Sequence, residues 1–324
     1  MMMVPIWAAG ARGQWMADGR LPGRGGEYNM RANQKDAALD IEKIRNMQIG
    51  TVEQRYGKRE TILYALGLGY GADPLDAAEL PFVFEGTGDG LRCVPAYVNV
   101  LCDPGFWAQD PQYGIDWVRL LHAEQEFTMH RPMPACGTLR GEHRIAGIED
   151  KGLGRGALLH QEKELFDAAS GEKIATVRTT LFLRGNGGEG GYGTAPAAAE
   201  PVPERAPDRV VDISTLPRQA LLYRLSGDWN PLHADPAIAR RAGFDKPILH
   251  GLCTKGIACR AVLAAYCGND PARLRGMFVR FSKPVMPGET IRFTFFEEPG
   301  RLRFRAIAVE RGAVVLDRCT ATLN

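Results

Sequence analysis

The sequence predicts an α+β protein with two copies of one fold, each a central helix wrapped by a strongly curved antiparallel sheet. Three observations support this fold class: the length of the chain, a linker near its middle, and motifs that recur in the same order on both sides. The 324 residues are 45% hydrophobic, which is enough for two ordinary cores. We divide the chain into an N-terminal extension (1–36), a first repeat (37–185), a linker (186–208) and a second repeat (209–324).

The N-terminal extension is rich in glycine and arginine, and we expect it to be disordered, with Met30 as an alternative start. Its first residues, MMMVPIWAAGA, have no basic segment and only a short, interrupted apolar stretch, so they do not predict a signal peptide. No apolar run approaches the roughly 20 residues that cross a bilayer. We therefore expect no membrane partner.

Charge and cysteine content narrow the class of protein further. The 40 basic and 38 acidic residues form no long run of one sign, which argues against a nucleic-acid partner. The seven cysteines are scattered and include no C-x-x-C pair. An odd, scattered set is typical of reduced thiols, so we expect buried, inert cysteines and a cytoplasmic location.

Similar motifs flank the linker, whose glycine-rich and then Ala/Pro-rich composition forms no core of its own. The segment ETILYALGLGYGADP of the first repeat matches QALLYRLSGDWNPLHADP of the second, with Tyr64 against Tyr223 and Leu66 against Leu225. Farther along, RPMPACGTL matches KPVMPGETI. The matches keep the same order, which indicates duplication of one fold.

Each repeat is expected to share one layout. A short apolar helix (62–68 or 220–225) leads through a segment rich in Gly, Pro and Asp to a second apolar helix. In the second repeat this central helix should run from Gly251 to about Tyr266, where apolar residues recur at helical spacing. The alternating stretches RFTFFE and RLRFRAIAVE then predict antiparallel strands.

The two repeats differ most at one loop. The second repeat has SGDWNPLH, with Asp228 and His233, where the first has LGLGYGADP without either. Proline disfavours helical geometry in the residue before it, so Asn230-Pro231 predicts a turn that can bring the carboxylate and the imidazole together. Such a pair can hold a water and perform acid and base chemistry on it.

Structural explanations exist for each residue alone. Asp228 could cap a helix and His233 could be an ordinary core histidine, but their joint presence in one repeat favours function. His250-Gly251 adds a third feature, because backbone N–H groups at the start of the central helix can stabilise an oxyanion. The alternative is that Gly251 only permits a tight entry into the helix.

The segments YRLSGDWNPLHADP and AGFDKPILHGLC resemble the signature of the MaoC-like hydratases, in particular the (R)-specific enoyl-CoA hydratase 2 type of peroxisomal multifunctional enzymes and bacterial stand-alone proteins. The resemblance continues in ILYALGLG, LHAEQ and LFLRGNGGEGG, and it covers roughly Ala38 to Leu323. One departure is Glu189, where an aromatic residue is expected in the glycine-rich motif.

The resemblance implies a double hot-dog fold in which the second repeat is catalytic and the first, degenerate repeat accommodates the acyl chain. It implies hydration of trans-2-enoyl-CoA to (R)-3-hydroxyacyl-CoA in fatty-acid metabolism, without a metal or other cofactor, by a homodimer. On matching positions, Asp228 and His233 form the catalytic dyad and the N–H of Gly251 binds the thioester oxygen. Asn230 would orient the dyad or its water.

Substrate-binding candidates lie around this loop and in the first repeat. His250 precedes the oxyanion glycine, and Glu124 lies in the family-like LHAEQ segment. Lys255, Arg280 and Lys283 are candidates to bind the phosphates of CoA. For the last four residues, plain solvation at the surface is the alternative.

Two other functions fit parts of the sequence. His233, Asp235 and His250 have the residue types of a two-histidine, one-carboxylate iron site, which would indicate an oxygenase. This interpretation leaves the repeat unexplained. The other alternative is an acyl-CoA binding protein without catalysis, which the retained Asp228–His233 pair argues against.

The loop of the first repeat also suggests a place for the acyl chain. Gly67, Gly69 and Gly71 replace the dyad there, and the apolar segment ELPFVFE follows. We expect these residues to open an apolar groove beside the active site.

Overall fold

The computed structural model describes residues 38–88 and 90–324. The expected disordered extension (1–36) and the alternative start at Met30 lie outside the described residues. Among the described residues, no helix combines the length and the apolar character needed to cross a membrane.

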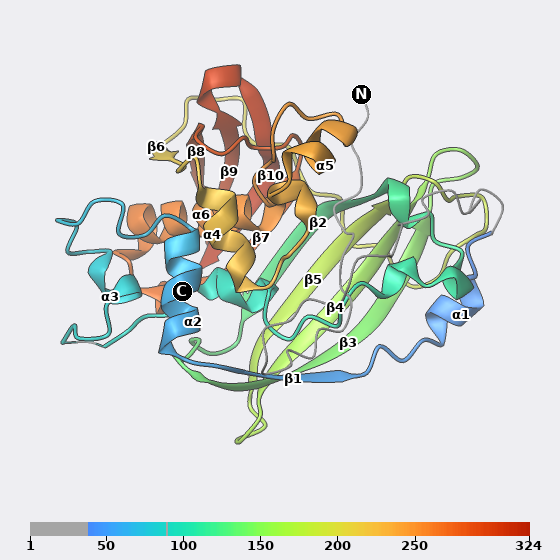
Figure 1. Cartoon of the computed structure of the whole chain (residues 1–324), viewed down its shortest axis with the longest axis horizontal. Helices are drawn as coiled ribbons and strands as arrows, with labels where there is room; N and C mark the ends of the chain where they lie inside the picture. The colour runs from blue at the N-terminus through green and yellow to red at the C-terminus, as the bar shows by residue number, and fades with distance from the viewer. Residues whose placement is uncertain (1–37, 89) are drawn as a thin grey trace.

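Ten strands of the described part of the chain form one continuous antiparallel sheet, in the order β1-β3-β4-β5-β2-β7-β10-β9-β8-β6 (Figure 1). The strands are β1 (Thr51–Tyr56), β2 (Leu120–Met129), β3 (Gly137–Asp150), β4 (Ala157–Asp167), β5 (Lys173–Leu183), β6 (Arg209–Ser214), β7 (Leu274–Phe281), β8 (Thr290–Glu298), β9 (Arg301–Ala308) and β10 (Ala313–Leu323). The first repeat supplies β1 to β5 and the second supplies β6 to β10. They join where β2 pairs with β7, so the sheet passes from one repeat into the other within one chain.

The expected strands follow from alternating residues. In β9, buried and partly exposed side chains alternate along RLRFRAIA, as the sequence predicted. The buried members, such as Phe304, pack with Phe293 and Phe295 of β8 in the core. One face of the strands is therefore apolar because every second residue is apolar.

The central helix of the second repeat is α6 (Gly251–Val262), and a π-helical turn continues it over Leu263–Cys267. This confirms the expected helix from Gly251 to about Tyr266. Nearly every residue of α6 is buried. Gly256 allows Leu68 of the first repeat to pack directly on the helix, because a Cβ at this glycine would lie 2.3 Å from a Leu68 methyl carbon.

The first repeat departs from the expected layout. In the described residues, no long helix stands where α6 stands in the second repeat, and the 3₁₀ turn η1 (Pro95–Asn99) packs against α6 instead. The other helical segments are α1 (Ile41–Arg45), α2 (Lys58–Gly67), α3 (Leu80–Val83), η2 (Trp107–Gln109), η3 (Pro111–Tyr113), η4 (Trp117–Arg119), α4 (Gln219–Tyr223), η5 (Arg224–Ser226), η6 (Pro231–His233), α5 (Pro236–Arg241), η8 (Pro271–Arg273) and η9 (Val309–Arg311).

The matched motifs of the two repeats pack against each other through α2 and α4 (Figure 1). Gln219 donates a hydrogen bond of 2.6 Å to the carbonyl oxygen of Gly67, and a Cβ at Gly67 would lie 3.2 Å from the Cα of Tyr223. Gly69 lies equally close to Arg260. The expected apolar groove is therefore wrong at Gly67 and Gly69, because the second repeat fills that space, and Val83 of the first repeat packs at Gly71.

The segment between β5 and β6 joins the two repeats. Its glycine-rich part is packed rather than free: Tyr192 pairs with Ile148 of β3, and the carboxylate of Asp150 accepts hydrogen bonds from Gly188 and Gly190. Glu189 accepts a bond from the N–H of Gly187, away from the cleft described below.

Candidate active site

A cleft of about 210 Å³ lies between the two repeats. Its floor is the start of α6 and the end of β7, and β2 of the first repeat closes one side. Its lining includes Leu121, His122, Asp228, His233, Gly251, Leu252, Phe281 and Lys283. The wall is mostly apolar, so a charged group within it meets little water.

A tight loop places Asp228 in this cleft. The chain leaves η5 through Gly227, whose φ of 128° lies in the region that favours glycine. The carboxylate of Asp228 then accepts a hydrogen bond of 3.2 Å from the N–H of Asn230. This contact fixes the turn and holds the aspartate inward, where it is 8% exposed.

Asn230 shapes the segment that carries His233. Its side-chain oxygen accepts a hydrogen bond of 3.0 Å from Leu232 and so caps η6, while Pro231 sits in the first helical position. The side-chain nitrogen of Asn230 is buried and has no partner among the described residues. Asn230 therefore positions the loop that carries the pair.

The hydrogen bonds of His233 fix its tautomer. Nδ1 lies 2.8 Å from the carbonyl oxygen of Ile248, which can only accept, so Nδ1 carries the hydrogen. In the neutral ring Nε2 is then an acceptor, and it has no partner among the described residues. A buried acceptor without a partner is ready to bind a water.

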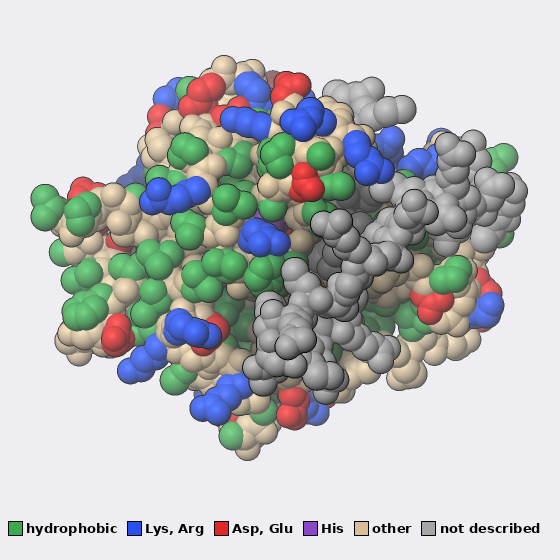
Figure 2. Space-filling model, in the orientation of Figure 1, with side chains coloured by type: hydrophobic (Ala, Val, Ile, Leu, Met, Phe, Trp, Pro, Cys, Tyr) green, Lys and Arg blue, Asp and Glu red, His purple; other side chains and the backbone are tan. Residues whose placement is uncertain are grey.

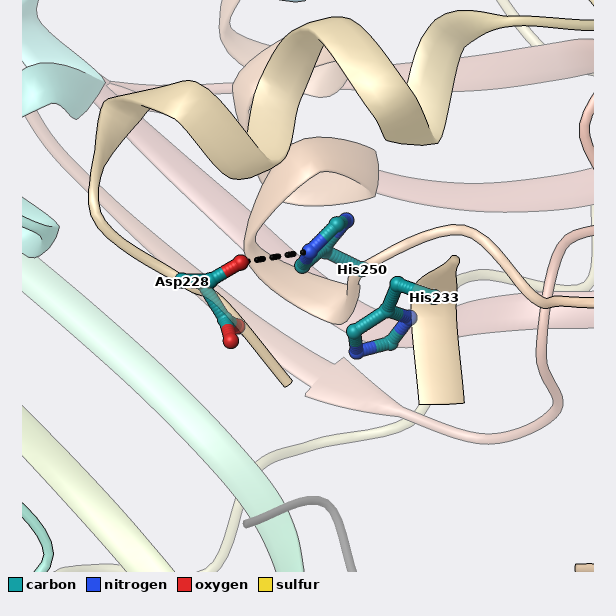
Figure 3. A group of neighbouring side chains, drawn as sticks. All are labelled: Asp228, His233 and His250. Carbon is teal, nitrogen blue, oxygen red and sulfur yellow. Dashed lines mark hydrogen bonds between the residues drawn. The ribbon is translucent and has the colours of Figure 1, made fainter. Parts of the chain in front are cut away.

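His250 packs directly on His233. The two rings stack with centroids 3.7 Å apart and planes at 27°. Nε2 of His250 donates to the backbone oxygen of Asp228 at 3.2 Å, the dashed line in Figure 3. One ligand atom from each of Asp228, His233 and His250 can be chosen so that all three lie within 4.8 Å of one another, a spacing that could also hold a metal ion.

Burial shifts the pKa values of these groups in opposite directions. It raises the pKa of Asp228 to about 7 and lowers the pKa of His233 to about 4. Burial also lowers the pKa of His250 well below its usual value, and the neighbouring His233 adds to this. Between about pH 4 and pH 7 the Asp228–His233 pair therefore holds one proton, which is the state that an acid–base pair needs.

Gly251 lies at the N-terminus of α6 and faces the cleft. The first N–H groups of a helix have no intrahelical partners. No side chain of the described residues caps this end, so these groups can bind an oxygen atom. A Cβ at Gly251 would lie 3.3 Å from the ring of Phe281. The glycine keeps open the space in front of these donors.

The other predicted substrate-binding residues have different surroundings. Lys283 lines the cleft. Arg280 and Glu124 pair with each other across the β7–β2 junction, with bonds of 2.8 and 2.5 Å. The prediction that Lys255 binds CoA phosphates is wrong. This lysine is fully buried, and its Nζ bonds the side chain of Asn99 at 3.2 Å, so it cannot meet a phosphate at the surface. Asp235 lies outside the site and caps α5, so it does not complete the suggested iron site.

His122 belongs to the cleft but was not predicted. It packs edge-on against Phe281, with centroids 4.9 Å apart, and its Nε2 bonds Gln125 at 2.8 Å. A register shift between His122 and Glu124 turns His122 and Gln125 to the same buried side. Simple alternation along LHAEQ gives no signal of that bulge.

Known families match both halves of the chain. Residues 54–185 match the MFE-2 hydratase 2 N-terminal domain, and residues 198–318 match the MaoC like domain. Among curated relatives, 3-hydroxyacyl-thioester dehydratase Y of Mycobacterium tuberculosis is 44% identical over 80% of this chain and 90% of its own length. Enoyl-CoA hydratase 2, peroxisomal, of Arabidopsis thaliana is 38% identical over 81% of this chain and 88% of its own.

Solved structures agree with these matches. A MaoC-like dehydratase from Phytophthora capsici superposes with a TM-score of 0.77 at 34% identity, covering 88% of this chain and 99% of that one. A Mycobacterium tuberculosis protein described as a double hotdog fold superposes with a TM-score of 0.51 at 15% identity, over 86% and 95% of the two chains. The fold is therefore the double hot-dog fold that the resemblance implied.

Proposed function

This chain belongs to the MaoC-like hydratase and dehydratase family, and from that membership we propose that it hydrates trans-2-enoyl-CoA to (R)-3-hydroxyacyl-CoA in fatty-acid metabolism. The observation that carries the proposal is the buried Asp228–His233 pair, which holds one proton near neutral pH beside the free N–H groups of α6. Metal or redox chemistry is not needed for this reaction.

Gly251 and the Asp228–His233 pair have separate roles in hydration. The thioester oxygen binds the N–H of Gly251, which draws electrons from C3 of the enoyl group. A water between the carboxyl group of Asp228 and Nε2 of His233 adds its oxygen to C3 and gives one proton to the pair. The pair returns one proton to C2, so it begins and ends the cycle with the same number of protons.

Groups around the pair hold it in place. His250 fixes the backbone of Asp228 and supports the ring of His233, and the cap by Asn230 sets the segment between them. Lys283 at the cleft is the cation best placed for a phosphate of CoA, and Arg280 keeps its partner Glu124. These residues position the substrate and the pair.

Coupled assays with crotonyl-CoA test this function. Hydration removes the ultraviolet absorbance of the conjugated thioester, and the product is then offered to 3-hydroxyacyl-CoA dehydrogenases of known stereospecificity. We expect NADH with an (R)-specific dehydrogenase and none with an (S)-specific one. Absence of turnover would contradict the hydratase function, and NADH only with the (S)-specific enzyme would contradict the (R) assignment.

We also propose that the protein is a homodimer, supported by an apolar patch over α2 and α4 (Figure 2). Its residues Leu66, Leu221, Leu225 and Trp229 are 39–52% exposed. Exposed apolar residues that are grouped in this way are typical of a protein–protein contact, and a two-fold dimer would cover the patch of one chain with the same patch of the other.

Light scattering after gel filtration tests the dimer. We expect a dimer for the wild type and a monomer for Leu221→Glu, whereas Leu153→Glu, at an exposed turn away from α2 and α4, should stay dimeric. A monomeric wild type would contradict the proposal.

The protein is also proposed to be cytoplasmic. The seven free cysteines support this location, and fractionation of cells would test it.

A further inference from the structure

A second cavity of about 90 Å³ lies in the first repeat, next to the catalytic cleft. His122 and Leu252 line both spaces, so they form the wall between them. Unlike the cleft, this cavity has many polar side chains, among them Asn99, Asp103, Gln125, Gln161, Lys163 and Thr179. An alkyl chain alone gives such a wall nothing to bond.

Lys163 on β4 is a buried lysine that lines this cavity. Its Nζ donates to the backbone oxygens of Asn99 at 3.2 Å and Leu101 at 2.5 Å. No ion pair among the described residues includes Lys163. Burial of an ammonium group costs free energy unless it is fully bonded, and two neutral oxygens leave its third hydrogen for another acceptor.

The second buried lysine, Lys255, approaches Asn99 from α6. Its Nζ donates to the side-chain oxygen of Asn99 and lies 4.8 Å from the centre of the Phe127 ring. Lys163 and Lys255 thus meet at the backbone oxygen and the side-chain oxygen of a single asparagine. These bonds at Asn99 connect Lys163 of the first repeat with Lys255 of the second.

Hydrogen bonds connect Asn99 to the wall of the catalytic cleft. Gln125 donates to the side-chain oxygen of Asn99 at 3.1 Å. The oxygen of Gln125 accepts a bond from Thr179 and is bonded to Nε2 of His122, each at 2.8 Å. His122, on the wall of the cleft, is therefore bonded to the polar groups that line the second cavity.

The charges at this cavity favour a neutral ligand. Burial lowers the pKa of Lys163 to about 8, and the nearby Asp103 carboxylate opposes that shift. Burial also lowers the pKa of Lys255 well below its ordinary value. With Asp103 in the same wall, the cavity has no uncompensated positive charge to attract a carboxylate.

We propose that this cavity is a subsite for a neutral oxygen function, a hydroxyl or keto group, on the acyl chain of the substrate, away from its double bond. At the wall, Lys163 supplies a donor, and Asp103 and the hydroxyl oxygen of Thr179 supply acceptors. The inference rests on the proposed enoyl-CoA hydratase function and deepens it. The preferred substrates are then oxygenated acyl thioesters rather than plain fatty acyl chains.

Matched substrates test the subsite in the wild-type enzyme. We would measure kcat/KM for trans-2-enoyl-CoAs of about six to twelve carbons with a methyl, a hydroxymethyl or a carboxyl group at the end of the chain. The hydroxyl series should exceed the plain series by about tenfold or more at one length, as a site built for hydrogen bonding discriminates. Equal or better rates for plain chains at every length would overturn the proposal, as would a preference for the carboxylate.

Variants locate the preference. In Lys163→Met, and separately in Thr179→Val, the ratio of hydroxylated to plain substrate should fall towards one. Because the ratio is taken within each protein, a general loss of activity cancels. Lys173→Met is the matched control, since Lys173 pairs with Glu164 outside the cavity, and it should keep the wild-type ratio.

Hydration of crotonyl-CoA distinguishes failure of the proposed function from failure of the subsite. If the wild type does not hydrate crotonyl-CoA, the proposed function is wrong. If it hydrates crotonyl-CoA without any preference for oxygenated chains, the subsite alone is wrong. A ratio that survives both Lys163→Met and Thr179→Val would also overturn the assignment of this cavity.

Discussion

The matched loops of the two repeats, residues 67–71 and 227–233, have opposite properties. In the first repeat the loop packs against the second repeat, and Glu79 ties it down by accepting bonds from Gly71 and from Arg260. In the second repeat the loop carries a buried acid and a buried imidazole, and polar atoms of Asn230 and His233 lack partners among the described residues.

This difference shows how, in a duplicated fold, one loop can serve packing while the matching loop carries the acid–base groups. Buried polar atoms without partners cost stability, so those of Asn230 and His233 are expected where a water or a substrate supplies the missing bonds. In the first loop only the hydroxyl of Tyr70 lacks a partner among the described residues. The first loop has lost those groups and serves as a rigid neighbour. If this separation holds, activity depends on the second loop and tolerates changes in the first.

The largest expected effect is from loss of the imidazole. His233→Gln should lower kcat for crotonyl-CoA by about 10²- to 10⁴-fold, because the variant lacks a group that exchanges a proton in the transition state. The matched change in the first repeat is Asp73→Asn, at the position that aligns with Asp235, and it should alter kcat by less than about twofold. A large loss in Asp73→Asn would break the contrast between the loops.

The pH dependence of kcat/KM should report the single proton of the pair. The rate should be highest between about pH 4 and pH 7 and fall about tenfold per pH unit above that range, where Asp228 loses its proton. On the acid side, protonation of His233 adds a second proton and lowers the rate. Steady-state rates from pH 5 to pH 10 would check this, and a rate that keeps rising through pH 9 would disagree with it.

The free energy of unfolding should fall over a lower pH range than activity does. The pKa of Asp228 is higher in the folded protein than its ordinary 3.8, so the folded state binds more protons than the unfolded state between about pH 4 and pH 7. The free energy of unfolding therefore decreases as pH rises through this range, and the loss is complete above about pH 7.

Asp228→Asn removes this ionisation. It should raise the free energy of unfolding by about 1–3 kcal/mol at pH 8 and by less at pH 5, measured by urea denaturation. The comparison of the two pH values is the internal control. A variant that is less stable at pH 8 than at pH 5, relative to wild type, would contradict the burial of an ionised carboxylate.

The smallest expected effect is from removal of metals. The cluster of Asp228, His233 and His250 could bind an ion, but water addition by the pair does not need one. Dialysis against EDTA should leave kcat for crotonyl-CoA unchanged within about twofold. Loss of activity with recovery on adding one metal would replace the acid–base account by a metal-assisted one.

Much of this arrangement could be predicted because it has a local signal. Alternating residues in RLRFRAIAVE and the apolar period after Gly251 predicted the strands and the central helix. The Asn230-Pro231 turn and the asymmetry of the repeats pointed to Asp228 and His233, which the structure brings together with His250.

The remainder depends on tertiary contacts that have no local signal. Lys255 was expected at the surface because lysine is usually solvated, yet helix α6 is enclosed on all sides. The groove at Gly67 and Gly69 was wrong because a glycine-rich loop also permits close packing of another chain segment. The cavity beside His122 depends on a bulge in β2 that alternation cannot reveal.

A double-mutant cycle tests most directly the claim that Asp228 and His233 work as one unit. We would compare kcat for crotonyl-CoA in wild type, Asp228→Asn, His233→Gln and the double variant, with circular dichroism to confirm folding. If one shared proton performs the reaction, the double variant should be about as slow as the slower single variant. Losses that multiply in the double variant would contradict the shared pair, and near-wild-type hydration in any of the three would contradict the site itself.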